Sequence, residues 1–248
     1  MSMSRDELIY MAKVCEQTER FDDMLVYMKK VLDFNEDLSI EDRNLLSVAY
    51  KNSVGTRRTA WRVLSSIETK EEAKGSQFLV LLRDYKAQIE KELDKICEEI
   101  IELLDTKLIE SAKNNAQSQV FYLKMRGDYY RYIAEYATGE KHNKAADNAY
   151  EAYSKANEIA SANLDTTNPI RLGLALNFSV FYYEVRNDPK QACQLAKQAF
   201  DDAIADIEKI DEENYKDSTT IMQLIRDNLT LWTSELEQDD EDHPETGA

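Results

Sequence analysis

The chain has 248 residues, of which 43% are hydrophobic, and its formal net charge is −17. The hydrophobic content is sufficient for a buried core, whereas the negative charge argues against nucleic acids and anionic membranes as partners. Six glycines and three prolines leave few places for tight turns, so helices are expected to dominate over sheet.

Four helices are predicted in the first half of the chain. Ser4 and Glu7 form a capping-box pattern that opens a helix ending near residue 19, and a second helix is expected over residues 21–34. Ser39 and Asp42 repeat the capping pattern before a long helix over residues 40–69. Apolar residues at three- and four-residue spacing predict the fourth helix over residues 77–110.

Five further helices are predicted in the second half: one that ends at residue 138 after a polar break at 113–117, then 144–162, 169–186, 189–208 and 212–236. Asn168 and Asp188 each precede a proline, which pairs a capping residue with the proline favoured at the first helical position. Short loops make neighbouring helices antiparallel. The sequence therefore predicts one all-α domain of nine helices over residues 1–236.

The chain ends in a different kind of segment. Residues 237–248 are rich in acidic side chains and contain no lysine, no arginine and no large apolar residue. Such a segment buries too little surface to fold by itself, so it is predicted to be a disordered acidic tail.

The cysteines and the N-terminal residues indicate the cellular compartment in which the protein is expected. Cys15, Cys97 and Cys193 are odd in number and far apart, which favours reduced thiols over a disulfide framework or a zinc cluster. The chain begins without an apolar signal segment, and no run approaches the ~18 apolar residues that span a bilayer. The expected location is the cytoplasm or the nucleus.

Enzyme signatures are scarce in this sequence. It contains no glycine-rich phosphate loop, no dinucleotide fingerprint and no H-E-x-x-H motif, and its two histidines are His142 and His243. With 48 acidic residues, chance pairs of carboxylates are unavoidable, so no pair is assigned acid–base chemistry. We therefore predict no catalytic residue, no metal site and no cofactor.

The most unusual stretch is YLKMRGDYYRYIAEY, residues 122–136. At about 100° per residue, Lys124, Asp128, Arg131 and Glu135 fall in one narrow stripe of an otherwise apolar helix. Arg126 lies across from the stripe and has no assigned role. Two interpretations stay open: an internal ladder of ion pairs, or an anion site with a positioned arginine.

Similar polar stripes occur on three other predicted helices. The residues concerned are Lys51 and Arg58, seven apart; Asn177 and Glu184, seven apart and flanked by Leu176 and Val180; and Asn228 and Trp232, four apart. Each stripe alone fits a solvated face or ordinary packing. Together they suggest a channel with a basic wall and an apolar wall, which suits an extended peptide that carries a phosphate, because arginine binds phosphate oxygens in a bidentate manner.

Four stretches resemble the 14-3-3 family: RNLLSVAYKNSVGTRRTAWR (43–62), residues 122–136, NPIRLGLALNFSVFYYEV (168–185) and IMQLIRDNLTLWTSE (221–235). The resemblance covers nearly the whole chain up to the tail. It implies a cup-shaped subunit of nine antiparallel helices with a concave amphipathic groove. It further implies a homo- or heterodimer that binds phosphoserine or phosphothreonine segments of client proteins without catalysis.

The resemblance also implies which residues bind the phosphopeptide. They are Lys51, Arg58, Arg131 and Tyr132 at the phosphate, Lys124 further along the groove, Asn177 and Asn228 on the peptide backbone, Glu184 and Trp232 in support, and Leu176, Val180, Ile221, Leu224 and Leu231 in the apolar wall. Asp128 and Glu135 would then hold the basic side chains in place.

A dimer interface follows from the same resemblance, between the first helix of one subunit and the third and fourth helices of the other. Arg20 and Glu92 match one ion pair of the family, and Tyr85 belongs to the same interface. Asp23 is kept, but its usual lysine partner is here Gln88. Ala60 stands where several members have a serine whose phosphorylation loosens the dimer, so that route is expected to be closed.

The resulting hypothesis is an adaptor that masks, clamps or bridges its clients, with no nucleic-acid or membrane partner. The alternative is a helical-repeat scaffold that binds unphosphorylated peptides or client surfaces. A cryptic hydrolase would need a nucleophile or a metal cluster that the sequence lacks.

Overall fold

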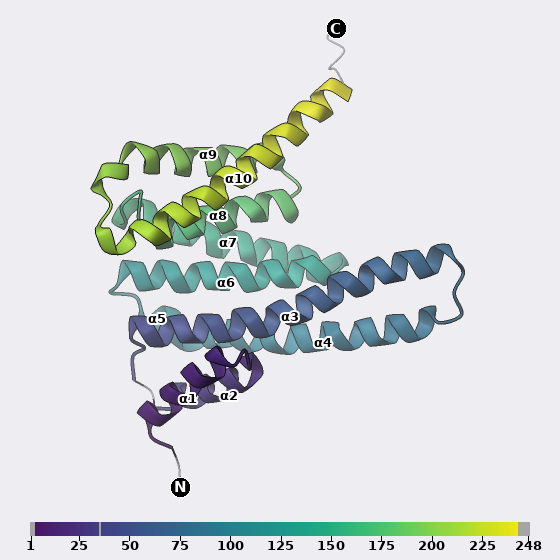
Figure 1. Cartoon of the computed structure of the whole chain (residues 1–248), viewed down its shortest axis with the longest axis horizontal. Coiled ribbons are helices and arrows are strands. Elements are labelled where there is room, and N and C mark those ends of the chain that lie inside the picture. The colour runs from purple at the N-terminus through teal and green to yellow at the C-terminus, as the bar shows by residue number, and fades with distance from the viewer. Residues whose placement is uncertain (1–2, 35, 243–248) are drawn as a thin grey trace. The chain divides into compact units, whose positions relative to one another are not determined.

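The computed structural model describes residues 3–34 and 36–242, and all regular structure in these ranges is helical (Figure 1). This confirms the all-α class. The chain divides into two compact units, Met1–Leu103 and Leu104–Ala248. The single domain, the cup shape and the dimer stay predictions.

The first unit consists of α1 (Arg5–Gln17), α2 (Phe21–Leu32), α3 (Ile40–Ala73) and α4 (Leu79–Leu103). Both predicted capping boxes are present, with the Ser4 hydroxyl accepting from the Glu7 amide and the Ser39 hydroxyl from the Asp42 amide. α2 and α4 pack along α3, and their core side chains include Met24, Met28, Leu46, Leu93 and Ile100, all fully buried. The apolar stripes of these helices therefore form a core within the unit.

The second unit begins with a π-helical turn at Leu104–Leu108 and the short α5 (Ile109–Ser111). It continues with α6 (Ala116–Tyr136), α7 (Gly139–Asn163), α8 (Pro169–Glu184), α9 (Pro189–Ala205), the 3-10 turn Ile207–Lys209 and α10 (Glu212–Asp242). α6 and α7 form the closest helix pair, because α7 presents a stripe of buried alanines to its neighbours: Ala145, Ala149, Ala152, Ala156 and Ala160.

Helix boundaries agree with the predictions to within four residues, α3 ending at Ala73 rather than at residue 69, except at three places. The predicted fourth helix is α4, the π-helical turn and α5 in succession, and counting this run once gives nine helices in the described ranges. α7 begins at Gly139 rather than at residue 144. Gly139 has a φ of +60°, a backbone conformation that glycine adopts without strain, so the chain can reverse direction between α6 and α7 at this residue. α8 and α9 begin at the predicted prolines.

The third difference concerns the acidic end. The last helix is predicted to end at residue 236, ahead of a disordered tail, whereas α10 continues to Asp242. Extending an existing helix adds backbone hydrogen bonds without a new nucleation step, so the segment does not need to bury apolar surface. The rest of the predicted tail, residues 243–248, lies outside the described residues.

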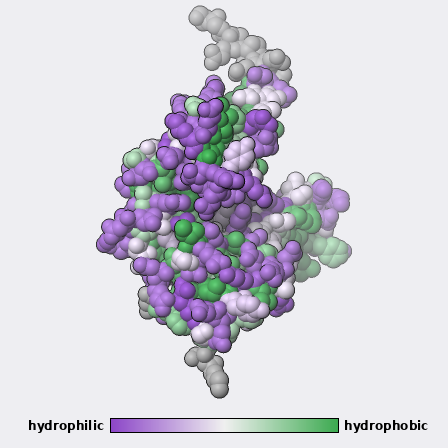
Figure 2. Space-filling model, turned by 60° about the vertical axis from the view of Figure 1, so that its left-hand side comes forward, coloured by the Kyte–Doolittle hydropathy of each residue, from purple (hydrophilic) through white to green (hydrophobic). Residues whose placement is uncertain are grey.

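The surface in Figure 2 is mostly hydrophilic, with hydrophobic residues in small groups, as expected for a chain with 32% charged residues. No helix of the described residues is long and apolar enough to cross a membrane. The same residues contain no group of three or more histidine, cysteine or acidic side chains arranged to hold a metal ion.

Candidate functional site

The charged stripe of α6 lies within the second unit and is largely buried. Lys124 Nζ donates a hydrogen bond of 2.8 Å to Asp128 Oδ2, and Arg131 Nη2 lies 3.6 Å from Asp128 Oδ1. The exposed fractions of Asp128 and Arg131 are both 7%. Residues three and four apart on a helix share a face, and for Lys124, Asp128 and Arg131 the predicted stripe is confirmed as a set of contacts.

Two residues from other helices join this stripe. The Tyr153 hydroxyl of α7 donates to Asp128 Oδ1 at 2.5 Å and accepts from Arg131 Nε at 3.1 Å. From α8, Asn177 Nδ2 donates to Asp128 Oδ1 at 2.8 Å. We call Lys124, Asp128, Arg131, Tyr153 and Asn177 the Asp128 network.

Protonation in the Asp128 network follows from these contacts. Burial acts to raise the pKa of Asp128, but the charges of Lys124 and Arg131 and the hydrogen bonds from Lys124 and Tyr153 lower it below its ordinary value. Burial raises the pKa of Tyr153 well above its usual range, so the phenol keeps its proton and can donate it. Burial opposes the charge of Arg131, yet Tyr153, Tyr132 and Asp128 raise its pKa well above normal. With two cations and one carboxylate, the network is positive.

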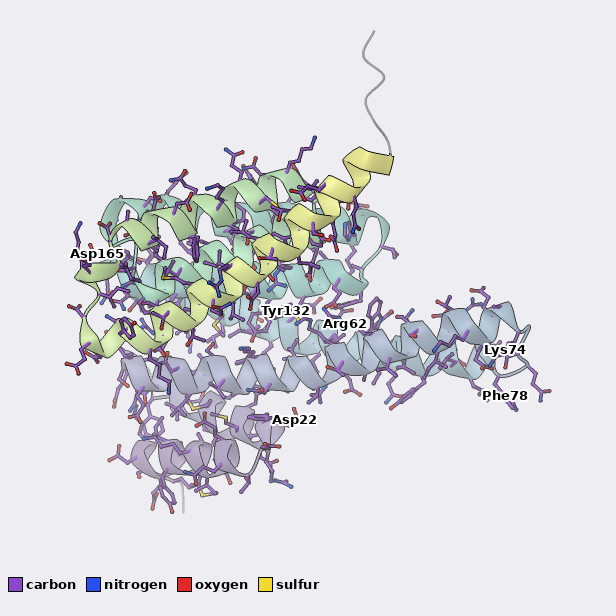
Figure 3. The ribbon with its side chains drawn as sticks, turned by 45° about the horizontal axis from the view of Figure 1, so that its top comes forward. Asp22, Arg62, Lys74, Phe78, Tyr132 and Asp165 are labelled. Carbon is purple, nitrogen blue, oxygen red and sulfur yellow. The ribbon has the colours of Figure 1, made fainter. Side chains whose placement is uncertain are left out.

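Arg131 keeps hydrogen-bonding capacity that the network does not use. Its Nη1 lies 3.6 Å from Glu184 Oε2 and its Nη2 lies 3.6 Å from Asp128 Oδ1, both longer than the ~2.8 Å of a charge-assisted hydrogen bond. The Glu184 side chain is 48% exposed. Tyr132, labelled in Figure 3, places its ring centroid 4.9 Å from the guanidinium carbon. The side chain is thus fixed through Nε, while neither terminal nitrogen lies within hydrogen-bond distance of these two carboxylates.

The predicted apolar wall lies on α8 and α10 of the same unit. Leu176, Val180 and Ile221 are half-buried against the core of these helices, whereas Leu224 and Leu231 are 48% and 55% exposed. Asn228 is half-buried. Trp232 is only 3% exposed and stacks on Tyr183 with 4.8 Å between ring centroids, so most of its ring serves packing between α8 and α10.

The remaining phosphate-site candidates belong to the first unit. Lys51 is exposed and Arg58 is half-buried, and both lie on α3. Next to Arg58, Arg57 links three helices of the unit. From α3 it forms ion pairs with Asp22 of α2 at 3.0 Å and with Glu92 of α4 at 2.9 Å. A groove shared by Lys51, Arg58 and the Asp128 network stays a prediction.

Of the predicted dimer residues, three are engaged within the chain. Arg20 pairs with Asp23, and Glu92 pairs with Arg57. Tyr85 is 53% exposed, and Gln88 is also exposed. An ion pair between Arg20 and Glu92 of two subunits would therefore replace existing contacts.

Three residues have roles that the sequence did not reveal. Tyr153 was not singled out, and neither was Gly127, where an added Cβ would lie 2.7 Å from two carbons of the Tyr153 ring. Glycine inside a helix costs about 1 kcal/mol relative to alanine, so its presence there was a usable signal of a close approach. Arg126 pairs with Asp105 at 2.7 Å and lies over the Tyr130 ring.

Comparison with known proteins gives one consistent result. The family model described as 14-3-3 protein matches residues 11–233. The chain is 59% identical over 234 residues to a 14-3-3 protein homolog of Candida albicans, which covers 94% of this chain and 88% of the relative. It is 57% identical over 242 residues to a 14-3-3-like protein of Helianthus annuus, with 96% and 93% covered. For the 14-3-3-like protein GF14 phi of Arabidopsis thaliana the identity is 55% over 241 residues, with 96% and 90% covered.

Proposed function

Since the chain belongs to the 14-3-3 family of adaptor and regulatory proteins, we propose that it binds segments of client proteins that carry phosphoserine or phosphothreonine. Arg131 carries this proposal. A phosphate ester brings about −1.5 to −2 charges and three acceptor oxygens. A buried guanidinium that is fixed through Nε and offers two terminal nitrogens matches that group in charge and in bidentate geometry.

Lys124 and Asn177 support a peptide ligand on the same face. Lys124 uses one of its three donors on Asp128. Asn177 donates its amide N–H to Asp128, so its carbonyl oxygen would be the atom that accepts from main-chain N–H groups of a ligand. Asn228 and the exposed Leu224 and Leu231 on α10 would extend the contact to the peptide beside the phosphate.

Lys51 and Arg58 enter the proposal on the resemblance of their stretch to the family. The mechanism is masking, clamping or bridging of clients. Two linked subunits would raise the effective concentration of a second site on the same client. Light scattering tests the dimer, because a mass near 28.7 kDa at micromolar concentration would contradict it.

Fluorescence polarisation with one peptide in phosphorylated and unphosphorylated form tests the proposal. The matched variants are Arg131→Gln and Arg126→Gln, which remove one charge each from the same helix. We expect Arg131→Gln to weaken phosphopeptide binding by at least about tenfold, the effect of losing a charged hydrogen-bond donor, and Arg126→Gln to leave it unchanged. Arg58→Glu tests the α3 residues in the same assay, with circular dichroism as the control for folding.

Two outcomes would contradict the proposal. Equal affinity of the intact protein for both peptides would favour the scaffold that binds unphosphorylated surfaces. Undiminished phosphopeptide affinity in both Arg131→Gln and Arg58→Glu would refute the assignment of these residues.

A further inference from the structure

Tyr153 occupies an unusual position in the Asp128 network. Its side chain is fully buried, and its hydroxyl stands between a carboxylate and a guanidinium, donating to Asp128 Oδ1 at 2.5 Å and accepting from Arg131 Nε at 3.1 Å. One hydroxyl thus satisfies two groups of opposite charge that would otherwise bind each other directly.

The distance between those two groups is the second observation. Arg131 Nη2 and Asp128 Oδ1 are 3.6 Å apart, although both are charged and only three residues separate them on α6. A direct hydrogen bond between such groups is normally about 2.8 Å long. The guanidinium would need to move by only about 0.8 Å to close that gap. The Tyr153 hydroxyl binds both groups, and Asn177 Nδ2 also donates to Asp128 Oδ1, at 2.8 Å.

We infer that the Tyr153 hydroxyl is a positioning group that holds Arg131 away from Asp128 and so keeps the terminal nitrogens of Arg131 available for a phosphate. This inference rests on the proposed phosphopeptide function. Gly127 belongs to the same arrangement, because its missing side chain leaves the space in which the Tyr153 ring lies against α6. The Tyr153 ring is also stacked on Phe178 of α8, with 5.4 Å between ring centroids, and this contact fixes the orientation of the ring.

The decisive experiment removes the hydroxyl alone. A crystal structure of Tyr153→Phe should show Arg131 Nη2 within about 3 Å of Asp128 Oδ1. A distance that stays at 3.6 Å, or a water molecule in the place of the hydroxyl with Arg131 unmoved, would overturn the inference. This measurement needs no ligand, so it decides the role of Tyr153 even if the protein fails to distinguish phosphorylated from unphosphorylated peptide, a failure that would count against the proposed function.

Binding gives the functional readout. We expect Tyr153→Phe to weaken phosphopeptide binding by about tenfold, the usual effect of engaging a charged donor elsewhere, with unchanged affinity for the unphosphorylated peptide. The matched control is Tyr150→Phe, one turn earlier on α7, whose ring is 43% exposed and packs against Tyr182. It should bind as the wild type does. Equal losses in both variants would contradict a specific role of Tyr153.

A double-mutant cycle separates positioning from simple damage to the core. In an Asp128→Asn background the attraction that pulls Arg131 inward is gone, so Tyr153→Phe should have little further effect on phosphopeptide affinity. A loss of about tenfold in both backgrounds would mean that the hydroxyl acts only on stability. If Tyr153→Phe does not fold, Gly127→Ala displaces the same ring and should weaken phosphopeptide binding; unchanged binding in that variant would overturn the inference.

Discussion

Replacing Gly127 by alanine should destabilise the second unit, although alanine is the better helix former. The new Cβ would lie 2.7 Å from Cδ1 and Cε1 of Tyr153 and 2.9 Å from Cζ. Carbon atoms pack best at about 3.5–4.0 Å, so the ring would have to move by about 1 Å. It has no free space for this movement, because it is fully buried, stacked on Phe178 and hydrogen-bonded to Asp128 and Arg131.

The size of the effect follows from two costs and one gain in free energy. Overpacking a core costs about 1–3 kcal/mol, and strained hydrogen bonds add about 1 kcal/mol. Alanine returns about 1 kcal/mol through its helix propensity. We therefore expect a net loss of about 2 kcal/mol in the free energy of unfolding, or a melting temperature lower by roughly 4–8 °C.

Gly55→Ala is the matched control, since Gly55 also lies inside a helix. An added Cβ there meets no heavy atom within 4 Å in the described structure, so the variant should gain about 0.5–1 kcal/mol. Urea unfolding followed by circular dichroism measures both variants at one protein concentration. If Gly127→Ala were as stable as the wild type while Gly55→Ala gained stability, the reasoning about a rigid Tyr153 ring would be refuted.

Two further predictions concern ion pairs of the first unit. Arg57→Gln removes the contacts with Asp22 and Glu92. The variant should lose about 1 kcal/mol in the free energy of unfolding at low ionic strength and less in high salt, because these ion pairs are partly exposed. An equal loss at both salt concentrations in urea unfolding would contradict this prediction. Burial acts to raise the folded-state pKa of Asp42, but hydrogen bonds from Arg5 and Ser39 lower that pKa below its ordinary value. Its stabilising contribution is therefore present above the unfolded pKa of about 3.9 and is lost as the pH falls through the lower folded value. The difference in stability between wild type and Asp42→Asn should shrink below about pH 4, and a constant difference from pH 7 to pH 2 would disprove the linkage.

Features governed by local chemistry were predictable from the sequence. The Ser4 and Ser39 caps and the starts of α8 and α9 lie where the pattern placed them, because a cap involves residues within four positions of each other. The contact between Lys124 and Asp128 was predictable for the same reason, since helical spacing puts both on one face.

Features governed by contacts between distant residues were not predictable. Tyr153 is 25 positions from Asp128 in sequence, and no periodicity on α7 distinguishes its buried hydroxyl from other core tyrosines. The partner of Arg126 likewise comes from the π-helical turn, at Asp105. The extension of α10 to Asp242 was missed because the prediction weighed burial and neglected the low cost of elongating an existing helix.

The fixed side chain of Arg131 also has a consequence for the rate and the entropy of binding in the proposed site. A free arginine loses up to about 2 kcal/mol of rotamer entropy when it is immobilised, but in this protein most of that ordering occurs during folding. If the proposed function holds, a phosphorylated segment at Arg131 meets a receptor that needs little rearrangement. Capture should be limited by diffusion and by ordering of the segment itself, and a peptide constrained in its bound conformation should show a smaller entropy loss in calorimetry than the flexible peptide.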